Sequence, residues 1–145
     1  MAAIINMGVY TLPEPFNFDG ISEKTAKKLG HNLYGNADIL LTCAKPVGIQ
    51  EVSITLWEES GSLSCTALDV RYTEKGFAPN PWHLIAFATM QPDFADKRPI
   101  ATQWKDAEGN FCCAIFRQWI VGRRLYVNRN DDEWRGNVLF SGSGT

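Results

Sequence analysis

The chain has 145 residues, a hydrophobic share of 45%, a charged share of 21% and a formal net charge of −2. This composition is typical of one soluble globular domain with a sizeable core, and it excludes a disordered chain. The slightly acidic balance argues against a protein that holds nucleic acid mainly by bulk charge. We therefore treat residues 1–145 as a single domain.

Positive charge is concentrated toward the end of the chain. Residues 111–145 hold 5 of the 14 basic residues and 3 of the 16 acidic ones, which leaves 9 basic and 13 acidic residues in 1–110. All five cations of the later stretch are arginines. This part of the sequence is therefore locally basic, although the protein as a whole is not.

The first residues, MAAIINMGVYTLPEP, lack the basic stretch that opens a secretory signal. Nowhere does an apolar run approach the ~18 residues of a membrane helix. We expect a cytosolic protein that does not associate with membranes. In that compartment the four cysteines, Cys43, Cys65, Cys112 and Cys113, are expected to be packed, unreactive thiols.

In the first part of the chain, residues 2–12 are apolar up to Pro13 and predict a strand, at the edge of a sheet. Residues 22–34 have a good N-cap and apolar side chains at helical spacing, which predicts a helix. Residues 38–44 read as a buried strand.

In the middle of the chain, residues 50–58 and 63–73 alternate between apolar and polar side chains, with the turn signal EESGS between them. This pattern predicts a β-hairpin. Residues 79–92 are apolar almost throughout, so they fit either a helix or a buried strand. Asn80 followed by Pro81 favours the helix, because this pair is a good N-cap and first helical residue.

The last part of the chain predicts strands over residues 100–105, 111–121, 125–129 and 134–140. The final residues, SGSGT at 141–145, have the composition of a flexible tail. Together the elements predict a β-rich α+β domain. Its sheet is expected to be strongly curved and antiparallel, or a partly closed β-barrel, with one or two short helices packed on it.

Few residues point to catalysis. The chain has only two histidines and no CxxC pair, so neither a catalytic residue nor a metal ligand is assigned, and no cofactor is expected. A cysteine nucleophile would need His83 beside it in space, and the sequence places none there. The acidic groups Glu58-Glu59 and Asp131-Asp132-Glu133 are expected to be solvated turn residues.

One cation stands out on the strand predicted over 111–121. The odd-numbered residues of this strand are apolar except for Arg117. We therefore expect this arginine either to pair with a buried acid, to reach a rim or to line a pocket. Asp69 is a candidate partner. Trp57 lies on the Ser53/Thr55 side of its strand and is a candidate for exposure. Aromatic and arginine side chains of this kind form binding hot spots; the candidate contact residues are Trp57, His83, Arg117, Trp119, Arg124, Tyr126 and Trp134.

These observations favour a small non-enzymatic binding module over an enzyme. It would engage a protein partner or a modest ligand through aromatic and arginine side chains of its C-terminal strands. A second copy of the chain is one candidate partner, since the sequence leaves the oligomeric state open. The alternatives are a β-barrel that binds a small apolar ligand, nucleic-acid binding by the basic C-terminal face, and a Cys/His-dependent enzyme.

Overall fold

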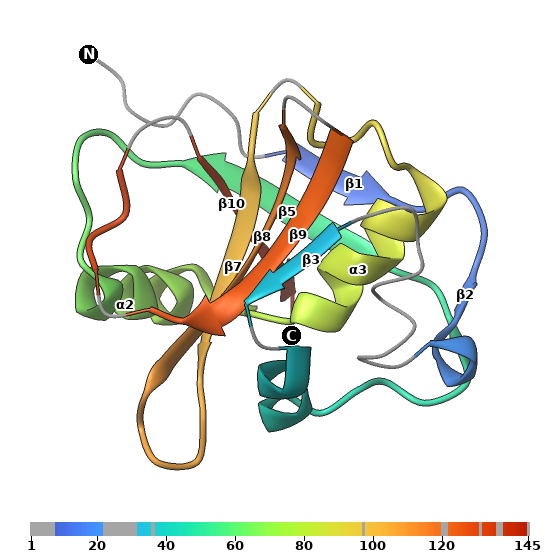
Figure 1. The fold of residues 1–145 in the computed structure, drawn as a ribbon, viewed down its shortest axis with the longest axis horizontal. Helices are drawn as coiled ribbons and strands as arrows, with labels where there is room; N and C mark the ends of the chain where they lie inside the picture. The colour runs from blue at the N-terminus through green and yellow to red at the C-terminus, as the bar shows by residue number, and fades with distance from the viewer. Residues whose placement is uncertain are drawn as a thin grey trace.

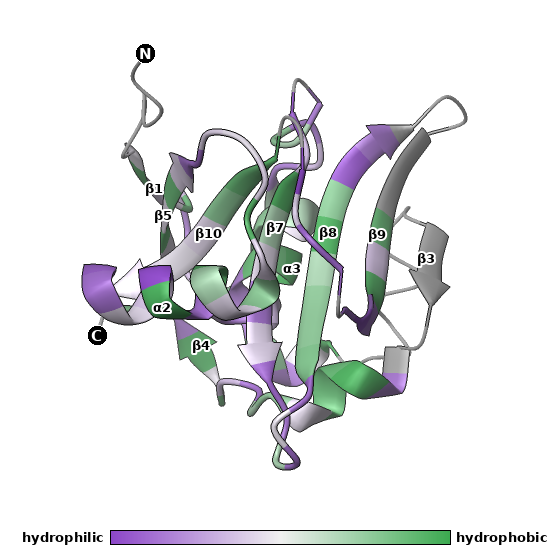
Figure 2. Cartoon of the chain, turned by 90° about the vertical axis from the view of Figure 1, so that its left-hand side faces the viewer, coloured by the Kyte–Doolittle hydropathy of each residue, from purple (hydrophilic) through white to green (hydrophobic). Residues whose placement is uncertain are grey.

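One large mixed sheet with a helix against each face forms the domain (Figures 1 and 2). The computed structural model describes residues 8–21, 32–35, 37–96, 98–119, 122–130, 132–135 and 138–144. The sheet has eight strands in the order β1-β5-β10-β7-β8-β9-β3, and β6 pairs with β10. Its strands are β1 (Gly8–Thr11), β3 (Asn32–Gly35), β5 (Ser53–Glu58), β6 (Phe77–Ala78), β7 (Ile100–Lys105), β8 (Phe111–Trp119), β9 (Gly122–Arg129) and β10 (Leu139–Gly144).

The remaining elements are short. The strands β2 (Phe16–Asn17) and β4 (Ile49–Gln50) form a separate pair. The helices are α2 (Cys65–Lys75) and α3 (Pro81–Met90), with 3-10 turns η1 (Phe18–Gly20) and η2 (Ala37–Thr42). Within the described residues, no helix combines the length and the apolar character needed to cross a bilayer.

The predicted fold class is confirmed as β-rich α+β, with a partly curled sheet that does not close. The sheet is mixed rather than wholly antiparallel, because β10 runs parallel to β7 and β3 runs parallel to β9. Residues 8–11 form β1, an edge strand of the described sheet, as expected. The rest of the strand predicted over 2–12 lies mostly outside the described residues.

Helix α3 confirms the helical interpretation of residues 79–92. The Asn80 side chain accepts a hydrogen bond from the Trp82 backbone N–H at 2.9 Å, and Pro81 occupies the first turn. The helix is apolar on nearly every side because it is buried between the sheet and the N-terminal loops; Leu84, Ile85 and Phe87 are all fully buried. Such a helix has no polar face, which explains why its periodicity resembled a strand.

The predicted hairpin of residues 50–58 and 63–73 is wrong in its second arm. Residues 65–75 form α2, in which Cys65, Leu68 and Tyr72 are buried at helical spacing while Val70 is 46% exposed. Ser64 caps the helix by accepting the Ala67 N–H at 3.0 Å. Leu68, Val70 and Tyr72 fit the alternation of a strand, but Leu68 and Tyr72 are also spaced i, i+4 as on one face of a helix. The Ser64 cap distinguishes the helix from the strand.

Three further expectations are corrected. The strand predicted over residues 38–44 is not formed, because residues 38–42 belong to the 3-10 turn η2. The helix predicted over 22–34 lies outside the described residues up to position 31, and residues 32–35 are strand β3. The strand predicted over 134–140 begins only at Leu139, and residues 139–144 form β10 instead of leading into a flexible tail.

Strand β10 lies in the middle of the sheet, between β5 and β7. Ser141 is 2% exposed, and its backbone carbonyl accepts a hydrogen bond from the Tyr72 hydroxyl at 2.6 Å. A Cβ at Gly142 would lie 2.8 Å from the Phe77 Cβ. Glycine and serine in this strand therefore allow close packing, and their composition resembled a linker only because small residues serve both purposes.

Two hydrophobic clusters, one on each side of the sheet, make up the core. The α3 side includes Ile54, Phe87, Cys112 and Phe116, and the α2 side includes the members Trp57, Leu68, Tyr72, Cys113, Trp134 and Phe140. Adjacent Cys112 and Cys113 thus point to opposite faces of β8, as expected for a strand. Figure 2 shows that α2 crosses the β5, β10 and β7 part of the sheet, and β8 and β9 extend beyond it.

Candidate binding groove

The antiparallel pair β8–β9 forms the floor of an open groove on the α2 side of the sheet. In the register of this pair, Cys113, Ile115 and Arg117 of β8 lie opposite Asn128, Tyr126 and Arg124 of β9. Directly opposite residues in a pair share one face, so these positions form two parallel rows. Cys113 is buried, whereas Ile115, Arg117 and Tyr126 are half-buried. The part of the floor beyond α2 is therefore accessible.

The described residues that follow β9, at positions 130, 132–135 and 138, form the wall of the groove. The Asn130 N–H donates to the Phe111 carbonyl at 2.9 Å, which starts the wall at the beginning of β8. Trp134 then exchanges two backbone hydrogen bonds with Leu63, at 2.7 and 3.0 Å. The wall ends where the Leu139 N–H donates to the Pro99 carbonyl at 2.9 Å.

Trp134 holds this wall in place through its side chain. Its indole N–H donates to the Gln103 side-chain oxygen at 2.7 Å, and the Gln103 amide donates to the Cys65 carbonyl at 2.8 Å. Its ring packs edge-to-face on Phe140, with the centroids 5.4 Å apart. Gln103 is 2% exposed, so this chain of hydrogen bonds is buried and holds the wall against β7 and α2.

The groove has a volume of about 320 Å³. Its lining combines apolar and charged side chains: Cys113, Ile115, Arg117, Tyr126, Asn130, Asp132, Glu133, Trp134, Arg135 and Val138. Asp132, Glu133 and Arg135 are exposed on the wall, where they form a charged rim. An apolar floor with a few polar groups at its edges is typical of sites that bind another molecule.

Three of the seven candidate contact residues, Arg117, Tyr126 and Trp134, meet in this groove. Arg124 lies opposite Arg117 in the register, and Trp119 ends β8 opposite Gly122. The side chains of Trp119 and Arg124 are outside the described part of the structure. The expected pairing of Arg117 with Asp69 is not observed, because Asp69 forms an ion pair with Lys105 at 3.3 Å.

Trp57 is not a contact residue, and the expectation that it is exposed is wrong. Its side chain is fully buried, edge-to-face with Tyr72 at 5.1 Å, and its indole N–H donates to Glu59 at 3.0 Å. Alternation along β5 was misleading because both faces of this strand are covered. Helix α3 packs on the Ile54 side and helix α2 on the Trp57 side.

His83 lies on α3, on the other side of the sheet from the groove. Its Nδ1 is 2.6 Å from the Ser143 hydroxyl, which also donates to the Ser53 carbonyl at 3.3 Å. One hydroxyl proton cannot serve both acceptors, so the two bonds coexist when Nδ1 carries the proton and donates to Ser143. Burial lowers the pKa of His83, which keeps the ring neutral. The histidine thus fastens β10 to α3, beside a separate open cleft of about 430 Å³.

The cysteines behave as the sequence predicts for packed thiols. All four are free; Cys65, Cys112 and Cys113 are buried and Cys43 is partly buried. Burial raises the pKa of Cys43 to about 11 and that of Cys113 to about 12, so both stay protonated at neutral pH. Cys65 donates its thiol hydrogen to backbone carbonyls of the wall, at 3.1 Å to Asp132. Cys43 and Cys113 therefore lack the thiolate character of a nucleophile.

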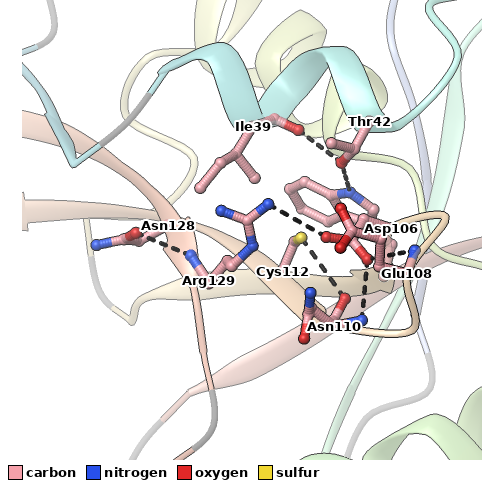
Figure 3. A network of polar contacts seen from close by, with 9 residues as sticks. Ile39, Thr42, Asp106, Glu108, Asn110, Cys112, Asn128 and Arg129 are labelled. Carbon is pink, nitrogen blue, oxygen red and sulfur yellow. Dashed lines mark hydrogen bonds and ion pairs between the residues drawn. The ribbon is translucent and has the colours of Figure 1, made fainter.

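A second hollow, of about 280 Å³, shares the lining residue Asn130 with the groove and is otherwise lined by Gly109, Asn110, Phe111 and Arg129. Arg129 forms an ion pair with Asp106 at 3.3 Å, as Figure 3 shows. Hydrogen bonds from the backbone N–H groups of Asn110 and Glu108, together with Arg129, lower the pKa of Asp106. Figure 3 also shows Thr42 of η2 beside the turn that joins β7 to β8. The Thr42 hydroxyl accepts a hydrogen bond from the Trp104 indole N–H at 2.8 Å. These contacts brace the end of β8–β9 next to the groove.

Sequence reasoning missed the wall residues Asn130, Asp132, Glu133 and Val138. The acidic group at 131–133 was assigned to a solvated turn, and Asp132 and Glu133 are indeed exposed. Their position on the rim follows from the bridge between Leu63 and Trp134, two residues far apart in the sequence. Among the described residues, no three His, Cys, Asp or Glu side chains are grouped to hold a metal ion.

The chain matches no family model, no curated protein and no solved structure. Proposals about its activity therefore depend on the geometry of the groove.

Proposed function

We propose that this protein is a non-enzymatic binding module that engages a protein partner through the groove of β8, β9 and the wall residues at positions 130, 132–135 and 138. The observation that carries the proposal is the meeting of Arg117 and Tyr126 on the floor with Trp134 on the wall, beside the apolar side chain of Ile115. Tyrosine, tryptophan and arginine are the residues most enriched at binding hot spots, because each combines a large contact area with a directional polar group.

The rigidity of the site supports the same proposal. Trp134 is held by buried hydrogen bonds, and the Tyr126 hydroxyl accepts a hydrogen bond from the Asn128 amide at 3.2 Å. Side chains that are already ordered lose little conformational entropy on binding, so more of the contact energy appears as affinity.

The other functions considered from the sequence have less support. An enclosed apolar-ligand site fits poorly, because the sheet is open and the groove carries charged groups. Two exposed carboxylates on the rim, Asp132 and Glu133, oppose a nucleic-acid backbone. A cysteine-dependent enzyme fits poorly with thiols of raised pKa. Free cysteines are consistent with a reducing compartment, and we place the protein in the cytosol.

Photo-crosslinking tests the proposal. The photoreactive analogue p-benzoyl-phenylalanine replaces Tyr126 in the groove, or Val70 on α2 as a matched exposed control, and adducts formed in cells are identified by mass spectrometry. We expect a defined protein adduct at position 126 and none of the same mass at position 70. Arg117→Leu should lower the yield at 126 several-fold, whereas Lys75→Leu, which removes a cation from α2, should not. Identical adducts at both positions, or none at 126, would contradict the proposal.

A further inference from the structure

The groove has an acidic end and a basic end, and this polarity restricts the partner. From the arrangement of charges we infer that the site binds an extended peptide segment with a basic residue near one end, an apolar residue in the middle and an acidic residue near the other end. This inference rests on the proposed function and names the chemical class of the partner.

The direction of the wall relative to β8 follows from its hydrogen bonds. Asn130 is bound to Phe111, at the start of β8. Trp134 is bound to Gln103, which lies opposite Cys113. Leu139 lies beside Ile100, which lies opposite Phe116. The wall and β8 therefore advance in the same direction, and each described residue of the wall can be assigned a level along the groove.

Charge changes sign along this direction. Asp132 and Glu133 lie between the levels of Phe111 and Cys113, and both are exposed on the rim. Arg135 follows on the wall, and Arg117 lies on the floor beside Val138 at the far end. A peptide whose charge at each end is opposite to that of the groove would be attracted at both ends. A peptide of uniform charge would be repelled at one end.

The spacing of the two ends suits an extended chain. From Cys113 to Arg117 is four residues of strand, or about 14 Å at about 3.4 Å a residue. An extended ligand therefore needs its two charged residues about four positions apart. Ile115 lies on the floor between these two levels and, together with Trp134 at the level of Cys113, offers apolar contact to a residue in the middle of the ligand.

A displayed library of random linear peptides, selected on the intact protein, tests this inference. Wild-type protein should enrich peptides that carry one acidic and one basic residue about four positions apart, with an apolar residue between them. Arg117→Glu should replace the acidic preference by a basic one and weaken the wild-type peptides by about tenfold. The double variant Asp132→Lys/Glu133→Lys should invert the preference at the other end only.

Lys75→Glu on α2 is the control for a charge reversal outside the groove, and urea unfolding confirms that each variant is folded. Enriched peptides without the charge pair, or a pair that Arg117→Glu leaves unchanged, would overturn the inference while leaving the binding module in place. So would a Tyr126 cross-link to a protein when no linear peptide is enriched. Preferential binding of a single-stranded oligonucleotide added as competitor would overturn both proposals, because the proposed function names a protein partner. Failure of the Tyr126 cross-link as well would remove both proposals.

Discussion

The buried hydrogen bonds that hold Trp134 allow a quantitative test of the groove's construction. Gln103→Met keeps the length of the side chain but removes both of its hydrogen bonds, to the Trp134 indole and to the Cys65 carbonyl. A buried polar group left without a partner costs about 1–3 kcal/mol. The indole N–H has only one hydrogen to donate and carries this penalty fully; the carbonyl, with two lone pairs, carries less. We expect the free energy of unfolding to fall by about 2–3 kcal/mol.

Trp134→Phe orphans the Gln103 oxygen instead and shrinks the ring that packs on Phe140, so it should cost about 2–4 kcal/mol. In the double variant neither partner of the Gln103–Trp134 bond remains, and apolar groups replace both. We therefore expect it to be at least about 1 kcal/mol more stable than the sum of the single effects predicts.

Urea unfolding followed by circular dichroism measures all four proteins. With a slope of about 1–3 kcal/mol per molar urea, a loss of 2 kcal/mol moves the midpoint by about 1 M. Single effects that simply add, to within about 0.5 kcal/mol, would show that the bond between Gln103 and Trp134 does not hold the wall.

Three further predictions concern β10, the histidine and the cysteines. Gly142→Ala should lower the free energy of unfolding by about 1–3 kcal/mol, because its Cβ would meet Phe77. Gly144→Ala, whose Cβ would have no atom within 4 Å, should be neutral. Equal free energies of unfolding for the two variants, measured in urea, would restore the flexible-tail interpretation. Burial lowers the pKa of His83, so the unfolded chain takes up this proton first and the free energy of unfolding should fall as the pH drops below about 6.5. His83→Gln should reduce this dependence on pH, and an unchanged dependence would contradict the burial of His83. Cys113, whose pKa is raised to about 12, should react with a thiol reagent only on unfolding, and the protein should lose stability as the pH rises above 9.0, where the unfolded thiol ionises; rapid labelling of native Cys113 would refute its burial.

The sequence predicted β8, β9 and α3 well because local signals and tertiary packing agree there. The odd positions of β8 do share one face, and Arg117 is its polar member. Residues 65–75 failed for the opposite reason: their apolar residues fit both periods, and only the Ser64 cap and Gly76, with φ +72°, distinguish the helix. Trp57 shows a related limit, since alternation cannot reveal exposure in a strand covered on both faces.

The candidate groove was predictable only in part. Its floor follows from the parity of one strand and its register with the next. Its wall depends on the bridge of Trp134 to Leu63 and on the buried side chain of Gln103, and no local pattern encodes such contacts between distant residues. The floor was therefore predicted as a set of residues, and the charged rim was not.

The central place of β10 has a consequence for how the protein is made. The β1–β5 part of the sheet joins the β7–β8–β9 part through β10, which is synthesised after all of them. A nascent chain that has reached only Arg129 already contains the buried residues of the α3-side cluster and those of the α2-side cluster except Trp134 and Phe140, but it lacks the strand that connects the two halves. Until residues 139–144 leave the ribosome, the edges of β5 and β7 remain open to other chains, and folding must wait. Protection by a chaperone until β10 has emerged should therefore reduce the aggregation of this protein during synthesis.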